Sequence, residues 1–289
     1  MIDGYETIGY DAVNVGGYDL AAGYTFLKSI ADSTSIPFLS ANLVNKESGK
    51  HVFDPYIIID RPPYKIGVVG VTNLLPQNVT EITMEDYLST GKTLIKELKE
   101  KTHLVIMLVN ADKKDKGKVK QEFADADYIF ISRDTQKTHR TQTQSTGPII
   151  YSPGKQGKYL AVIDLNIVHL DSPFVDVSFY KKQIKSAENR IANFQKKDPD
   201  KSLEEIYINQ PNILRNINVL NQQIKSANIQ LTSGVNQSEF RLVSMNKKIG
   251  DDLDMLAFVD VVFKKENEIK GLPNLPPGKK LKSPIRSLP

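Results

Sequence analysis

The sequence contains no cysteine and only four histidines in 289 residues. The lack of cysteine excludes disulfide bonds, thiolate metal sites and a cysteine nucleophile. Few neutral nitrogen ligands for a metal remain, namely His51, His103, His139 and His169. No apolar run reaches the roughly eighteen residues of a membrane-spanning helix, and no basic and apolar leader opens the chain. The sequence therefore predicts no membrane span and no signal peptide.

The net charge of the chain is also small. The 38 lysines and arginines are set against 34 aspartates and glutamates, which gives a net charge of +4, and much of the surplus lies near the C-terminus. This balance does not indicate a nucleic acid partner. With 40% apolar and 25% charged residues, the chain has an ordinary globular composition and can form a main domain plus a smaller one.

Apolar strand runs alternate with helical stretches up to residue 178, which predicts an α/β layer fold. Several strand runs are continuous in valine, isoleucine and leucine, as is typical of strands covered on both faces. The predicted strands span 10–15, 37–42, 65–72, 103–109, 127–132, 149–151 and 159–168. Amphipathic spacing predicts helices over 20–33 and 84–101.

The composition changes at about residue 179 to polar stretches rich in lysine, glutamine and asparagine. Apolar residues at steps of three and four predict two helices with facing seams, one on each side of a break at 198–200. Ser202 and Glu205 form a capping box that opens the second helix, and Pro211 must kink that helix or end a short first piece. We expect residues 179–233 to form an antiparallel helical hairpin.

Two further segments follow the predicted hairpin. Residues 234–270 contain a short strand at 240–245 and a helix at 251–265, and we expect them to pack back onto the fold. Residues 271–289 are rich in proline and basic residues and cannot build a core. We expect this last segment to be a disordered basic tail.

Four segments of the sequence match a known family in order and spacing. They are Ile8 to Gly16, Pro37 to Leu43 (PFLSANL), Tyr64 to Thr72 (YKIGVVGVT) and Gly154 to Leu160 (GKQGKYL). Together they resemble the 5'-nucleotidase branch of the calcineurin-like metallophosphatases. The resemblance implies an α/β fold with layered sheet and helices over residues 1–178, with the hairpin following it in place of the family's nucleotide-binding C-terminal domain.

The residues that the family uses for chemistry are replaced in this chain. The resemblance implies two divalent metal ions held by Asp, His and Asn, between which a hydroxide attacks phosphorus. The family's bridging Asn falls on Gly17 and its catalytic His on Tyr18, while ligand histidines fall on Asn110, Arg133 and Thr135. A guanidinium in place of a ligand opposes a dication electrostatically. We therefore expect neither catalytic residues nor a metal cofactor.

Some polar residues near the degenerate motifs leave alternatives open. Asp19 and Asp134 could retain one weak cation, and His139 could be a displaced ligand or a solvated loop residue. Tyr18 and Arg133 could remake the cleft into an anion pocket or simply fill it. Gly67 and Gly70 fit close packing better than a phosphate loop, because the third glycine of a dinucleotide fingerprint is absent.

The family's earliest motifs, an Asp-x-His and a Gly-Asp, have no counterpart in this sequence. We therefore expect the sheet to lack its first strands and to expose a strand edge and apolar surface.

Three functions remain open. The chain is a non-catalytic binding or scaffold protein, a phosphoester hydrolase completed by upstream residues or another subunit, or a truncated product without a separate function. A protein partner would bind the hairpin or the exposed sheet edge. By resemblance alone, the expected location is the periplasm or cell envelope.

Overall fold

A computed structural model describes residues 2–138, 147–170, 172–232 and 234–271. Its centre is a five-stranded sheet in the order β4-β5-β7-β8-β9. The strands are β4 (Tyr56–Arg61), β5 (Tyr64–Thr72), β7 (Leu104–Asp112), β8 (Tyr128–Arg133) and β9 (Ile149–Tyr151). All neighbours are parallel except β4, which pairs antiparallel with β5. The carboxyl ends of β5, β7 and β8 therefore meet at one edge, where α/β proteins place their sites.

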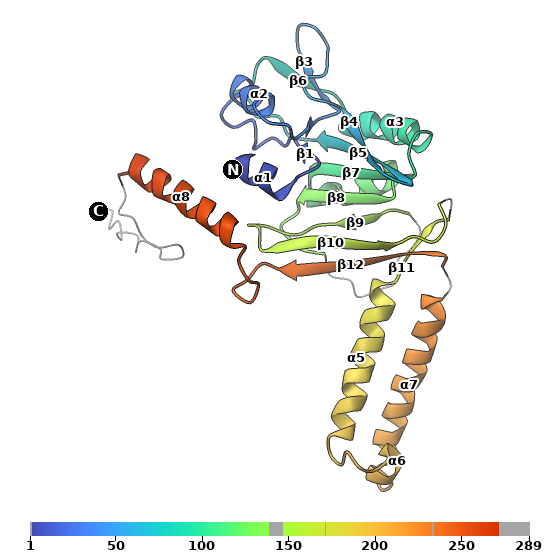
Figure 1. The fold of residues 1–289 in the computed structure, drawn as a ribbon. Coiled ribbons are helices and arrows are strands. Elements are labelled where there is room, and N and C mark those ends of the chain that lie inside the picture. Colours follow the sequence, from blue (N-terminus) through green and yellow to red (C-terminus); the bar gives the residue numbers. More distant parts are fainter. Residues whose placement is uncertain (1, 139–146, 171, 233, 272–289) are drawn as a thin grey trace, which may run out of the picture.

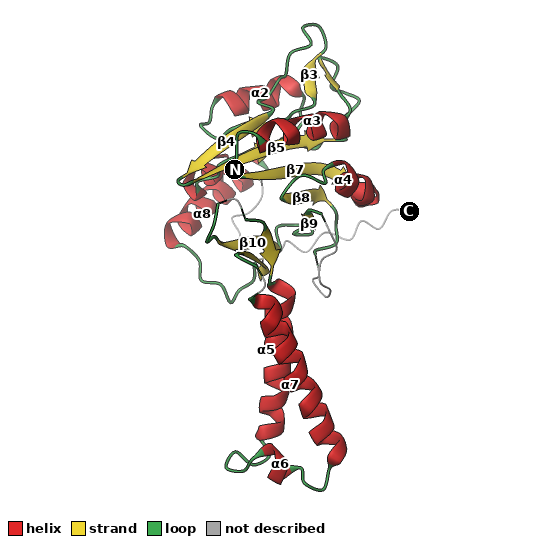
Figure 2. Ribbon diagram, turned by 90° about the vertical axis from the view of Figure 1, so that its right-hand side faces the viewer, coloured by secondary structure: helices red, strands yellow, loops and turns green. Residues whose placement is uncertain are grey.

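Two helices cover one face of this sheet (Figure 2). They are α3 (Tyr87–Lys99) and α4 (Lys116–Glu122), which follows a 3-10 turn, η1 (Lys113–Asp115). Alternate residues of the central strands meet these helices in the main core, which includes Val69, Val105, Met107, Ile129 and Phe123. Burial on both faces explains why the central strands are continuous apolar runs.

The opposite face of the central sheet is covered by two smaller sheets. One has the order β10-β12-β11 and consists of β10 (Tyr159–Asn166), β12 (Asn236–Ser244) and β11 (Phe174–Asp176). The other pairs β1 (Val13–Asn14) with β2 (Phe38–Leu39) in parallel. This second sheet lies directly over Gly70, where an added Cβ would stand 2.9 Å from Leu39 Cβ. Gly70 is thus a close-packing position, as the sequence predicted.

The N-terminal region builds its own core beside the main sheet. It contains α1 (Ile2–Ile8), α2 (Tyr24–Asp32) and the antiparallel pair β3 (Leu43–Asn45) and β6 (Ile82–Met84). Val15 and Leu20 are fully buried in this cluster, and Leu39 on β2 is fully buried as well. In the same region, Ile8 on α1 and Phe26 on α2 are 59% and 54% exposed, so the N-terminal region has both a closed core and exposed apolar side chains.

A pair of long helices projects from the body of the molecule (Figures 1 and 2). α5 (Ser178–Gln195) and α7 (Pro211–Leu231) lie side by side, joined through the short α6 (Leu203–Ile206). Ala187, Ile217 and Leu220 are buried between them. The capping box of Ser202 and Glu205 opens α6, and the long second helix begins at Pro211, a position where proline is tolerated.

The last described helix, α8 (Leu253–Ile269), touches α1 near Gly4, where an added Cβ would lie 3.6 Å from Phe258. No residue of α8 is buried. The segment 234–270 therefore divides into a strand that joins a sheet and a helix that leaves most of its apolar side chains exposed. The predicted tail lies outside the described residues, apart from Gly271.

No helix of the described chain is both long enough and apolar enough to cross a membrane. The mixed architecture confirms the predicted α/β class of layered sheets and helices. The strand expected over 10–15 is shorter than predicted, because only Val13 and Asn14 pair, and the one expected over 37–42 is confined to Phe38 and Leu39.

Candidate functional site

The positions that match the family's metal ligands gather at the carboxyl ends of β5, β7 and β8. Asn110 lies near the end of β7, Arg133 ends β8, and Gly17 comes from the turn after β1. A β-bulge between Val109 and Asp112 shifts the register, so that Asp112 pairs with Arg133. The fold therefore brings Gly17, Asn110 and Arg133 to one edge of the central sheet, and their side chains decide what this edge can do.

Gly17 is packed against the side chain of Leu74. A Cβ added at Gly17 would lie 2.5 Å from Leu74 Cγ and 2.8 Å from Leu74 Cβ, which is closer than real Cβ atoms approach. The space that a ligand side chain would need at this position is therefore filled. Tyr18, at the catalytic histidine position, is 76% exposed and points away from the core.

Asn110 is held inside a closed set of hydrogen bonds. Its Oδ1 accepts from Thr72 Oγ1 at 3.1 Å and from the backbone N–H of Gly17 at 3.5 Å, and its Nδ2 donates to Ser132 Oγ at 2.9 Å. An amide uses both ends in this way only when the surrounding donors and acceptors are fixed. Asn110 thus ties β5, β7, β8 and the β1 turn together where the family carries an imidazole.

Arg133 is similarly committed to neighbours within the chain. Nη2 forms an ion pair with Asp112 Oδ1 at 2.8 Å, and Nη1 donates to Asn73 Oδ1 at 2.7 Å. Asn73 in turn donates to Asp115 Oδ2 at 2.6 Å. The Arg133 side chain is 15% exposed, so the guanidinium keeps a permanent positive charge at a position that the resemblance matches to a ligand histidine.

Asp134 is a buried carboxylate that forms an ion pair with a lysine of the chain. It pairs with Lys116, the first residue of α4, and its Oδ1 accepts from the backbone N–H of Gln136 at 2.9 Å. Burial acts to raise the pKa of Asp134, but the hydrogen bonds from Lys116 and Gln136 and the charges of Lys116 and Lys113 together lower it below its ordinary value. Asp134 is therefore ionised and neutralised by lysine.

The remaining candidates do not add a ligand set. Asp19 is exposed and accepts from the backbone N–H of Gly16 at 2.8 Å, and Thr135 is also exposed. His139 lies outside the described residues. Within the described ranges there is no group of three or more His, Asp or Glu side chains placed to hold a metal ion. The matched positions offer an amide, hydroxyls and an ion-paired guanidinium, and the carboxylates of Asp112, Asp115 and Asp134 are already bound by Arg133, Asn73 and Lys116, a set that does not fit two catalytic metals.

Sequence reasoning missed the residues that fill and neutralise the site. Leu74, Asn73 and Asp112 all follow or end central strands, and Lys116 opens the helix after β7. Their position at the strand ends was a usable signal, because side chains there share one edge of a parallel sheet. Their pairings depend on tertiary packing and the β-bulge.

Part of this chain is similar in sequence to known proteins. Protein UshA of Salmonella pullorum is 32% identical over 122 residues, which is 39% of this chain and 22% of that protein. A 5'-nucleotidase of Vibrio cholerae is 33% identical over 115 residues, 37% of this chain and 21% of that protein. The chain thus aligns with about a fifth of the length of these relatives. No family model matches it.

A solved structure shares the fold over nearly the whole chain. The calcineurin-like phosphoesterase YfkN from Bacillus subtilis superposes with a TM-score of 0.60 at 13% identity, covering 93% of this chain and 74% of that one. The fold is thus that of the calcineurin-like phosphoesterases. Over the part that aligns, the chain is related to the 5'-nucleotidase branch of these metallophosphatases, which confirms the resemblance seen in the motifs.

Proposed function

We propose that this chain is a non-catalytic relative of the 5'-nucleotidases that acts as a binding or scaffold module. The observation that carries the proposal is the contact between Gly17 and Leu74, because an aliphatic side chain stands where the family's bridging ligand would project. The closed pairing of Asn110 with Ser132 and of Arg133 with Asp112 supports the same conclusion. A metal would have to break these bonds and displace a fixed positive charge.

The projecting helices are the surface that we assign to a protein partner. α5 and α7 carry six basic side chains (Lys181, Lys182, Lys185, Arg190, Arg215 and Lys225) against one acidic side chain, Glu188. Val219 and Ile229 are 50% and 60% exposed on α7. This basic surface with exposed apolar residues is complementary to an acidic protein surface. The edge strand β4 is a poorer candidate for the same partner, because it ends in Asp60 and Arg61, and charged residues on an edge strand discourage pairing with another strand.

A second candidate is a metal-dependent phosphoester hydrolase, which the names of the relatives favour. For this chain it would require ligands from residues outside the chain or from another subunit. The replaced positions Asn110 and Arg133 lie within the chain and would still lack imidazoles. By the same relationship, the proposed location is the periplasm or cell envelope.

The proposal predicts no hydrolysis of a nucleoside monophosphate above a buffer blank when the full chain is assayed with manganese, zinc or iron. The control is Asn110→Ala, which removes the amide at the centre of the candidate site. Phosphate release at the same trace rate in both proteins identifies a contaminant and leaves the proposal standing. Metal-dependent release that disappears in Asn110→Ala would establish the hydrolase and contradict the non-catalytic role.

A further inference from the structure

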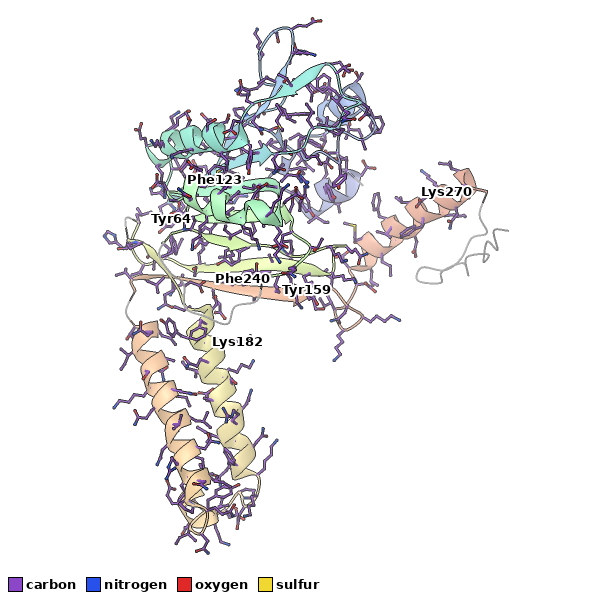
Figure 3. The ribbon with its side chains drawn as sticks, turned by 180° about the vertical axis from the view of Figure 1, so that it is seen from behind. Tyr64, Phe123, Tyr159, Lys182, Phe240 and Lys270 are labelled. Atoms are coloured by element: carbon purple, nitrogen blue, oxygen red, sulfur yellow. The ribbon has the colours of Figure 1, made fainter. Side chains whose placement is uncertain are left out.

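A cavity of about 420 Å³ lies at the base of the helical pair, and its lining includes none of the positions matched to the family's metal ligands. Three parts of the chain line it: the first turns of α5, the middle of β12, and the segment Lys137–Thr138 that follows the site. Figure 3 shows Lys182 near the top of α5, below the strands that carry Phe240 and Tyr159. The cavity volume lies within the range of about 300–1,000 Å³ that small-molecule sites occupy.

The charge of this cavity is strongly positive. Four lysines line it, Lys137, Lys181, Lys182 and Lys185, against one carboxylate, Glu239. Glu239 is already paired with Lys181 at 2.5 Å. Lys182 and Lys185 have no carboxylate within ion-pair distance among the described residues, and their spacing of three places them on the same face of α5. Gathering like charges is unfavourable, and an anion would relieve the repulsion.

The walls of the cavity are fixed before any ligand binds. Thr138 is held against the end of β9, since its backbone N–H donates to Ser152 O at 2.9 Å and its Oγ1 accepts from Ser152 N at 2.8 Å. The Lys137 ammonium lies 3.9 Å from the centroid of the Tyr159 ring, a cation–π contact that orients it. Ser178 Oγ accepts from the backbone N–H of Phe240 at 2.7 Å and joins α5 to β12. Such preorganisation lowers the entropic cost of binding.

The lining offers several separate positive charges. Its described cations are all lysines, which bind phosphate oxygens as point charges, and none is an arginine, whose flat fork pairs with a carboxylate or a phosphate by two parallel hydrogen bonds. One phosphate would leave most of the volume and at least one lysine unused. We propose that this cavity binds a ligand with two or more linked phosphates, held by Lys137, Lys182 and Lys185. This binding needs no metal and no residue of the degenerate site.

The test is calorimetric titration of the full chain with inorganic pyrophosphate at about 0.1 M salt, where charges a few ångströms apart are still poorly screened. We expect saturable binding, weakened at least about tenfold in the variant Lys182→Gln/Lys185→Gln. The matched control, Lys196→Gln/Arg215→Gln, removes two charges at the far end of the helices and should change the affinity less than about twofold. Far-UV circular dichroism verifies that both variants keep their helices.

Orthophosphate and citrate distinguish the ligand class in the same experiment. Both should bind at least about tenfold more weakly than pyrophosphate if linked phosphates are recognised. Three results would overturn the proposal: no pyrophosphate binding at millimolar concentration, equal loss of affinity in the two double variants, or citrate binding as tightly as pyrophosphate. None of these results depends on whether the chain hydrolyses nucleotides.

Discussion

Leu220→Asp is expected to melt the projecting helices while the α/β body stays folded. Leu220 is 1% exposed, and it lies in the seam between α5 and α7 with Ala187 and Ile217. The substitution removes a fully buried aliphatic side chain and places a carboxylate in an apolar seam, which costs at least about 3 kcal/mol. The helical pair has few contacts with the body, so the loss should remain local.

Hydrogen exchange followed by mass spectrometry measures this effect segment by segment. Amides of α5 and α7 should exchange quickly in Leu220→Asp, whereas those of β5 and β7 keep their protection. The matched control is Val219→Asp, which places the same charge at the neighbouring residue of α7, where the side chain is 50% exposed, and should change stability by about 0.5 kcal/mol. Equal exchange in the two variants would show that the seam does not hold the helices together.

Gly17→Asn is expected to destabilise the protein by about 2 kcal/mol, although it restores the residue type of the family. The new Cβ would stand 2.5 Å from Leu74 Cγ, so Leu74 must leave its place or the turn after β1 must shift. The measurement is the midpoint of urea unfolding, compared with Gly117→Asn. Gly117 lies on α4 with nothing within 4 Å of an added Cβ, and this control should not destabilise the protein.

A second variant isolates the cause of this destabilisation. Leu74→Ala opens the space that an asparagine at Gly17 needs, so Gly17→Asn should cost less in that background than in the natural chain. Such non-additivity is the signature of two residues in contact. If Gly17→Asn is equally destabilising in both backgrounds, Leu74 does not fill the ligand position and this part of the account is wrong.

The predictable parts of the fold were those with strong periodicity. The strand at 149–151 coincides with β9, the one at 65–72 lacks only the first residue of β5, and the one at 127–132 is shifted by one residue from β8 at both ends. The strand β4 was not predicted, although the sequence carries a signal for it. Ile57 to Ile59 form a β-branched run, and Pro62 and Pro63 follow shortly after it. Apolar periodicity identifies burial, and local turn signals are needed to place the ends of elements.

The helix predicted from residue 20 shows how burial can imitate helical spacing. Leu20 is fully buried, but it belongs to a series of turns closed by hydrogen bonds such as that from Gly23 N to Leu20 O at 2.9 Å. Gly23 has a φ of 95°, which a helix cannot contain, and α2 begins one residue later. The pattern of the sequence did not distinguish a buried turn from a first helical turn.

At the candidate site, the resemblance located the positions and the structure supplied their partners. The replacements at Gly17, Asn110 and Arg133 were visible in the sequence. Their consequences were not, because Leu74 and Asp112 reach them through sheet packing and a β-bulge. The ion pair between residues of neighbouring strands depends on how the strands are aligned, and the pattern of a single sequence did not reveal this register.

The most direct test of the non-catalytic role is the metal content of the purified chain after expression with added manganese, zinc and iron. Elemental analysis should find far less than one transition-metal ion per chain, because Gly17, Asn110 and Arg133 offer no ligand set in place of the family's Asn and His. Dialysis against a chelator should then leave the unfolding midpoint unchanged, since no bound ion stabilises the fold. Two metal ions per chain, with stability lost on chelation, would contradict the account.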